Sequence, residues 1–242
     1  RLIMDLVVNH TSDEHPWFQA ALKDPASPYR DYYFFRSEPN NWTSYFGDRA
    51  WSQLSEQGEW VLHLFSPKQM DLNWENPAMR RDIAAMVRSW LDRGIDGFRL
   101  DVINYISKVP GLPPGNRTIG DLTGYTGVEH YFYGPRLHEY LHELHEAAFA
   151  PACAFSVGET PGIGRQAAKL LTAPARRELD MIFSFDHLEN PGKSRFEEYR
   201  YDLNELKGHF IEWLEDYDGS WMSLFYENHD NRRMISKVDP DP

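Results

Sequence analysis

Five short apolar runs of strand length, separated by helical patterns, constrain this chain more than any other feature. The runs cover residues 2–8, 95–101, 154–159, 179–186 and 221–227. Polar turns bound them, and strands that alternate with helices are typical of βα units around a parallel sheet. The first run is almost continuously apolar, as expected for a parallel strand that is buried on both faces. The pattern therefore predicts an α/β fold with a parallel sheet.

The clearest helical pattern follows Asn76, which is a good N-cap, and Pro77 suits the first helical position. Gly94 is expected to end this helix. Its apolar face would contain Ile83, Val87, Trp90 and Leu91. Further helices are expected over residues 135–149, 165–171 and 203–217.

The interval between the first strand and the first helix, residues 11–75, is too long for a βα loop of about 2 to 6 residues. It contains strand-like runs at 32–35 and 60–65. We interpret it as a small subdomain inserted in the loop, with residues 1–10 and 76–242 forming the main domain. Five βα-type strands with such an insertion predict a partial (β/α)₈ barrel, a fold whose active site lies at the carboxyl ends of the strands.

Polar clusters close four of the five runs, and in a barrel these strand ends converge on one mouth. The clusters contain Asn9 and His10, Arg99 and Asp101, Glu159, and His229 and Asp230. Three carboxylates suit glycoside hydrolysis, in which one attacks the anomeric carbon, one protonates the leaving oxygen and one stabilises positive charge on the sugar. Arg99 lies two residues before Asp101 on a strand of period two, so it faces the same side and would keep that carboxylate ionised.

These clusters resemble, in the same order, the signature regions of the α-amylase superfamily of retaining glycosidases. Residues 69–73 resemble the fifth motif of that family, and the resemblance covers nearly the whole chain. The runs most similar to the oligo-1,6-glucosidase and dextran glucosidase branch are 5–15, 40–47, 71–77 and 97–104. The resemblance implies that the matched strands are the third to seventh of the barrel. It also implies that this chain is a fragment of the catalytic domain that is inactive alone.

By the same resemblance, Asp101 is the nucleophile, Glu159 the general acid/base and Asp230 the transition-state stabiliser. The substrate-binding residues would be His10, Arg99, Val102 and His229. In this branch the residue after the nucleophile tracks linkage preference, and a valine, as at Val102, accompanies α-1,6 bonds. The expected reaction is hydrolysis of α-1,6-glucosidic bonds at the non-reducing end of short oligosaccharides such as isomaltose.

The resemblance also implies that the enzyme needs no cofactor and no metal. The Asn of the first motif, here Asn9, binds calcium in α-amylases, but this branch generally lacks that site. Two residues depart from the family pattern, because Met70 stands where proline is usual and Glu227 stands where a neutral residue is common. We expect a cytoplasmic monomer whose partner is a small oligosaccharide substrate.

The charge balance argues against other partners. The chain has 25 Lys+Arg and 37 Asp+Glu, a net charge of −12, which disfavours nucleic acid and anionic membrane surfaces. No apolar run approaches the roughly 18 residues of a membrane span. The single cysteine, Cys153, excludes an internal disulfide, and we expect it to pack as a small buried hydrophobe.

Three alternatives stay open. Residues 138–142 fit the H-E-x-x-H pattern of zinc proteases, but a catalytic zinc needs a third protein ligand, and we favour an exposed amphipathic helix as the explanation of His138 and His142. Glycosidase-like domains also serve as non-catalytic structural subunits, which typically lose the carboxylates that this chain keeps. A glucosyl-enzyme could also pass its sugar to another sugar, as in a sucrose isomerase or transglucosylase.

Overall fold

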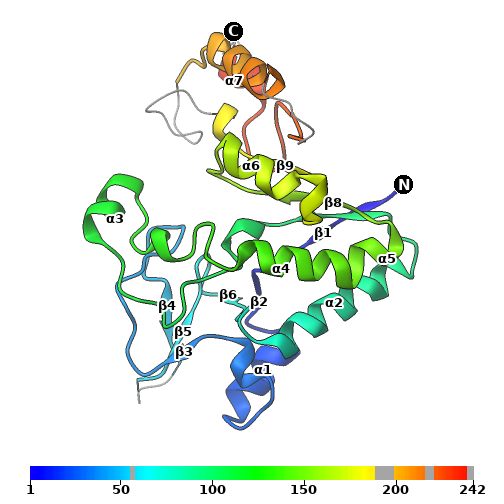
Figure 1. The fold of residues 1–242 in the computed structure, drawn as a ribbon. Coiled ribbons are helices and arrows are strands. Elements are labelled where there is room, and N and C mark those ends of the chain that lie inside the picture. The colour runs from blue at the N-terminus through cyan, green and yellow to red at the C-terminus, as the bar shows by residue number, and fades with distance from the viewer. Residues whose placement is uncertain (55–57, 189–198, 216–220, 239–242) are drawn as a thin grey trace. The chain divides into compact units, whose positions relative to one another are not determined.

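The computed structural model describes residues 1–54, 58–188, 199–215 and 221–238 (Figure 1). The chain divides into two compact units, Arg1–Phe155 and Ser156–Pro242. Each unit combines short parallel strands with helices, so the chain has the predicted α/β character. In the described part of the chain, no helix is both long enough and apolar enough to cross a membrane.

A parallel strand pair lies in the first unit. Strand β1 (Ile3–Leu6) pairs with β7 (Gly97–Leu100), and the register sets Asp5 beside Arg99. Helix α2 (Pro77–Leu91) connects this pair, and Asn76 caps it as predicted by accepting backbone hydrogen bonds from the first turn. The buried face of α2 contains Met79, Ile83, Ala84 and Val87.

Strand β1 is buried on one face only, so the prediction of burial on both faces is wrong here. Leu6 and Val8 are buried, whereas Ile3 and Val7 are 47% and 44% exposed. Successive side chains of a strand point to opposite faces. The described residues bury the Leu6 side and leave the Ile3 side open to solvent.

Helix α4 (Leu137–Leu144) runs beside α2 and continues through a π-helical turn (His145–Phe149) into the short helix α5 (Ala150–Ala152) (Figure 1). Cys153 then ends the helix in a left-handed conformation, with φ of 49°. Its side chain is exposed, and the expectation of burial is wrong. The reason is local, because the chain reverses at this residue and the turn lies at the surface.

The segment 11–75 contains helix α1 (Pro16–Lys23) and most of two small antiparallel sheets. One sheet pairs β2 (His10–Ser12) with β6 (Gln69–Asp71). The other contains β3 (Phe35–Arg36), β5 (Trp60–Leu62) and β4 (Trp51–Gln53), in that order.

An apolar core, which we call the aromatic core, joins this segment to the chain that follows β7. That part of the chain includes helix α3 (Arg117–Thr123). The buried members of the aromatic core include Trp42, Trp51, Leu62 and Leu64 on one side and Val102, Tyr105, Leu112 and Tyr131 on the other. The segment 11–75 therefore does not bury its aromatic side chains by itself.

The second unit contains another parallel pair. Strand β8 (Phe155–Glu159) pairs with β9 (Met181–Phe183), which sets Glu159 beside Phe183. Helix α6 (Arg165–Thr172) connects the two strands, as predicted. Helices α7 (Leu203–Glu215) and α8 (Met234–Val238) follow.

The strand predicted over residues 221–227 is reduced to a single bridge. Met222 bridges Ile182 of β9 in parallel, and the amide of Ser223 donates to the Ile182 carbonyl at 2.7 Å. Pairing does not continue at Phe225, whose carbonyl accepts a hydrogen bond from the His187 ring at 2.7 Å. Trp221 is 55% exposed, so this apolar side chain of the run is not buried here. The prediction of a full strand is wrong.

Candidate active site

An arginine between two carboxylates marks the carboxyl ends of β1 and β7. The guanidinium Nη1 of Arg99 donates to Asp101 Oδ1 at 2.6 Å and to Asp5 Oδ1 at 2.9 Å. The side chain of Asp101 is 24% exposed, so its carboxylate is positioned and still reachable from solvent. Charge-assisted bonds of this kind are stronger and more directional than neutral ones. Arg99 and Asp101 therefore face the same side, as their period-two spacing predicts.

His10 is buried next to this pair. Its Nε2 lies 2.9 Å from Gln69 Nε2, and its Nδ1 lies 3.3 Å from Asn9 Nδ2. Burial is the largest effect on its pKa and lowers it below the ordinary value of 6.5, while the negative charges of Asp71 and Asp101 oppose that shift. The neutral imidazole is therefore favoured near pH 7, which suits a hydrogen-bonding role.

A buried ion pair holds the residues around His10. Lys108 Nζ lies 2.7 Å from Asp71 Oδ1, and the two side chains are 1% and 0% exposed. The same ammonium donates at 3.0 Å to Asn9 Oδ1 and at 3.0 Å to the Tyr105 carbonyl. Burial lowers the pKa of Lys108, and the carboxylate of Asp71 opposes this shift. Sequence reasoning missed Lys108, because a lone lysine in residues 103–109 carries no motif.

The backbone turns sharply directly after Asp101. Val102 adopts a left-handed conformation, with φ of 38° and ψ of 42°. A β-branched residue rarely adopts this conformation, and such strain persists only where the surroundings enforce it. The Val102 side chain is 7% exposed and packs in the aromatic core. The buried Val102 side chain thus anchors the strained turn that directly follows Asp101.

A row of aromatic rings adjoins His10; the sequence marks Tyr45 only as one of several aromatic residues in the segment 11–75 and offers no reason to choose it. The Phe65 ring lies 5.3 Å from that of His10 and 5.6 Å from that of Tyr45, measured between centroids. Tyr45 stacks on Tyr125 at 5.3 Å with an interplanar angle of 6°. Phe65 and Tyr45 lie in the segment 11–75, which is rich in aromatic residues, but such richness does not distinguish a core residue from one that faces a ligand.

The remaining expected site residues lie in the second unit. Glu159 ends β8 and is 5% exposed. His229 and Asp230 are exposed and lie in a turn, where His229 Nε2 is 3.2 Å from Asp230 Oδ2. Their expected position at the end of a strand is therefore wrong, because that strand does not form beyond its single bridge.

The structure brings His10, Arg99 and Asp101 together within the first unit, and it pairs His229 with Asp230 in the second. Asp101 and Glu159 belong to different units. A separation of about 5 to 5.5 Å between their carboxyl groups, as a retaining mechanism requires, stays a prediction.

The H-E-x-x-H residues do not form a metal centre. Helix α4 buries the side with Tyr140 and Leu141, and Tyr133 Oη lies 2.5 Å from His138 Nε2. Across the ranges that the structure describes, no group of three or more His, Cys, Asp or Glu side chains could hold a metal ion. The pattern is explained by an amphipathic helix that packs against the domain.

The whole chain, residues 1–242, matches the family model of the α-amylase catalytic domain. The chain therefore belongs to the α-amylase family. Among curated proteins it is 46% identical to the oligo-1,6-glucosidase of Parageobacillus thermoglucosidasius, over 100% of this chain and 44% of that enzyme. It thus spans less than half the length of the curated relatives that it matches.

Solved structures show the same likeness. The trehalose-6-phosphate hydrolase of Bacillus licheniformis superposes with a TM-score of 0.89 at 39% identity, covering 98% of this chain and 43% of that one. The isomaltulose synthase of Klebsiella sp. LX3 superposes with a TM-score of 0.87 at 35% identity, covering 97% of this chain and 43% of that one.

Proposed function

We propose that the protein containing this chain is a retaining glycoside hydrolase that cleaves α-glucosidic bonds of short oligosaccharides. The observation that carries the proposal is the position of Asp101 at the end of β7. Its carboxylate accepts a hydrogen bond from Arg99, and Arg99 also donates to Asp5. A nucleophilic carboxylate needs a fixed position and access to substrate, and Asp101 has both. Membership of the α-amylase family and the likeness to an oligo-1,6-glucosidase support the same reaction.

In the proposed mechanism, Asp101 attacks the anomeric carbon while Glu159 protonates the glycosidic oxygen, which leaves with the remainder of the substrate. The resulting glucosyl-enzyme is attacked by water, from which Glu159, now a carboxylate, takes a proton. Each of the two displacements inverts the configuration at the anomeric carbon, so the released sugar keeps the α-configuration of the substrate. Asp230 stabilises the positive charge that develops on the sugar ring in both transition states.

The other candidate residues bind the sugar. His10 and Arg99 would hydrogen-bond its hydroxyl groups from the first unit, and His229 would do so from the second. The row that starts at Phe65 offers an aromatic face beside His10, onto which the apolar face of a pyranose can pack. No step of this mechanism uses a metal or an organic cofactor.

The architecture that we propose is a (β/α)₈ barrel in which the strands of this chain are the third to seventh. Residues 1–10 and 76–242 would belong to the barrel, and residues 11–75 to a subdomain in the loop after the third strand. The aromatic core that residues 42–64 share with residues 102–131 would fasten this subdomain to the barrel. We further propose that the protein is a cytoplasmic monomer.

The proposed linkage preference is α-1,6, because Val102 follows the nucleophile. The test compares glucose release from isomaltose, maltose and soluble starch by the full-length protein. Isomaltose should be cleaved fastest. Faster release from starch than from isomaltose would contradict the proposed substrate.

A second candidate function is sucrose isomerisation, favoured by the likeness to an isomaltulose synthase. Incubation with sucrose distinguishes the two. A hydrolase releases equal amounts of glucose and fructose, whereas an isomerase forms a disaccharide product. A non-catalytic structural role predicts no turnover of any of these sugars.

A further inference from the structure

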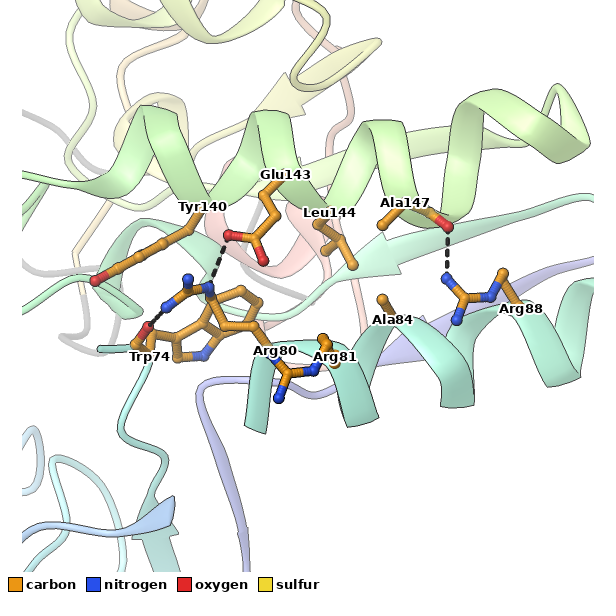
Figure 2. A pocket seen from close by; sticks show the side chains of 9 residues that line it. All are labelled: Trp74, Arg80, Arg81, Ala84, Arg88, Tyr140, Glu143, Leu144 and Ala147. Atoms are coloured by element: carbon orange, nitrogen blue, oxygen red, sulfur yellow. Dashed lines mark hydrogen bonds and ion pairs between the residues drawn. The ribbon is translucent and has the colours of Figure 1, made fainter. Parts of the chain in front are cut away.

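A pocket of about 270 Å³ lies between α2 and α4 in the first unit, and none of its lining residues is a candidate catalytic residue (Figure 2). Helix α2 contributes Arg80, Arg81, Ala84 and Arg88. Tyr140, Glu143 and Leu144 line it from α4, Ala147 from the π-helical turn, and Trp74 from the segment before α2.

The pocket carries an excess of positive charge in a chain whose net charge is −12. Three arginines line it, and Glu143 is the only acid among the lining residues. Glu143 is already engaged, because its Oε2 accepts from Arg80 Nε at 2.8 Å. Arg88 Nη1 donates to the Ala147 carbonyl at 2.7 Å rather than to a carboxylate. Among the described residues, no acid forms an ion pair with Arg81.

The spacing of the helices explains why the pocket exists. Arg80, Ala84 and Arg88 are four residues apart, so they lie on one face of α2 with the small side chain in the middle. Ala147, which also lines the pocket, lies in the π-helical turn, where the amide of Ala150 donates to the His145 carbonyl five residues earlier. The two alanines leave room between the helices, and arginines stand at both ends of that room (Figure 2).

We propose that this pocket binds a small anion with a phosphate or carboxylate head group. The planar fork of a guanidinium matches both head groups and binds them through paired hydrogen bonds. Arg81 and Arg88 supply the binding charge, because Arg80 is neutralised by Glu143. A volume just below the usual 300–1,000 Å³ of ligand pockets suits a molecule of few atoms.

The pocket is linked to the candidate active site through Trp74. Arg80 Nη1 donates to the Trp74 carbonyl at 2.6 Å, and the Trp74 indole donates to the Val8 carbonyl at 2.8 Å. Val8 lies two residues before His10, a candidate substrate-binding residue. Because Trp74 also lines the pocket, an anion bound there changes the surroundings of the indole that donates to Val8.

Binding is tested by calorimetry on the full-length protein, with inorganic phosphate and with malonate, at an ionic strength held constant with sodium chloride. At least one probe should bind saturably with a stoichiometry of one. In R81Q/R88Q its affinity should fall at least tenfold, and in R117Q, which changes an exposed arginine on α3, it should stay unchanged. A84L, which fills the pocket and keeps every arginine, should also abolish binding.

The two probes identify the head group. Binding of phosphate alone assigns a phosphate ligand, and binding of malonate alone assigns a dicarboxylate. The proposal is overturned if neither probe binds saturably, or if both R81Q/R88Q and A84L keep the affinity of the unchanged protein.

The link through Trp74 has its own measurement, which does not depend on catalytic activity. The ¹⁵N–¹H signal of the Trp74 indole, assigned with W74F, should shift with the same saturation as the calorimetric signal. The indole of Trp90, which lies on α2 outside the pocket, should not shift. A Trp74 signal that stays constant while the anion binds would overturn the link.

Discussion

Replacing Lys108 by methionine should destabilise the protein strongly, because it removes one partner of a fully buried ion pair. The substitution keeps most of the side-chain volume and removes the ammonium. Asp71 then keeps a charge at 0% exposure, with Asn9 Nδ2 and the Leu64 amide as its remaining donors. The Asn9 and Tyr105 oxygens lose their ammonium donor at the same time.

The expected magnitude follows from the geometry. At 2.7 Å and an effective dielectric constant of about 20, the attraction between the two charges is about 6 kcal/mol. Desolvation of each buried ion opposes it by several kcal/mol, so the pair contributes far less than its attraction suggests. Removing only the lysine leaves the desolvation of Asp71 uncompensated, which costs about 3 to 5 kcal/mol.

A double-mutant cycle measures this effect. In urea unfolding of the full-length protein, K108M and D71N should each lower the free energy of unfolding by about 3 to 5 kcal/mol. K108M/D71N should lose at least about 1 kcal/mol less than the sum of the two single losses. K68M, at an exposed lysine, should change stability by less than about 0.5 kcal/mol. Additive losses in the cycle, or a K108M loss below 1 kcal/mol, would show that the two charges are not coupled as described.

Three further predictions concern other parts of the chain. Asp101→Ala should lower turnover of isomaltose by about 10⁴-fold or more, and azide should restore activity with β-glucosyl azide as product; an α-product would contradict its role as nucleophile. Burial and the neighbouring His209 lower the pKa of His187 to about 4 from 6.5, so the unfolded chain binds a proton in that range while the folded chain does not. Stability should therefore fall by up to about 3 kcal/mol as the pH drops from about 6.5 to 4, and denaturation curves of His187→Asn should lack most of that loss. Gly97→Ala would place a Cβ 2.3 Å from the backbone carbonyl at the start of β8 and should cost more than about 2 kcal/mol, whereas Gly208→Ala, inside α7 with nothing within 4 Å, should be neutral or stabilising in the same unfolding assay.

The sequence by itself determined the features that depend on local rules. Asn76 and Pro77 specify the start of α2 because a cap acts within one turn of its own residue. Arg99 and Asp101 face the same side because the side-chain period of a strand is two. The α-amylase signature could also be recognised from the sequence, because its residues stand in a fixed order along the chain.

Only the tertiary structure decided the features that depend on distant partners. Lys108 became part of the site because folding places its ammonium against Asp71 and Asn9, and no local pattern records that meeting. The arginine pocket required α2 and α4 to lie side by side with alanines at the contact (Figure 2). The run 221–227 has strand propensity, yet a strand needs a neighbour along its whole length. The described residues give it only one bridge, at Met222, because propensity selects a backbone conformation and the available partners decide whether it pairs.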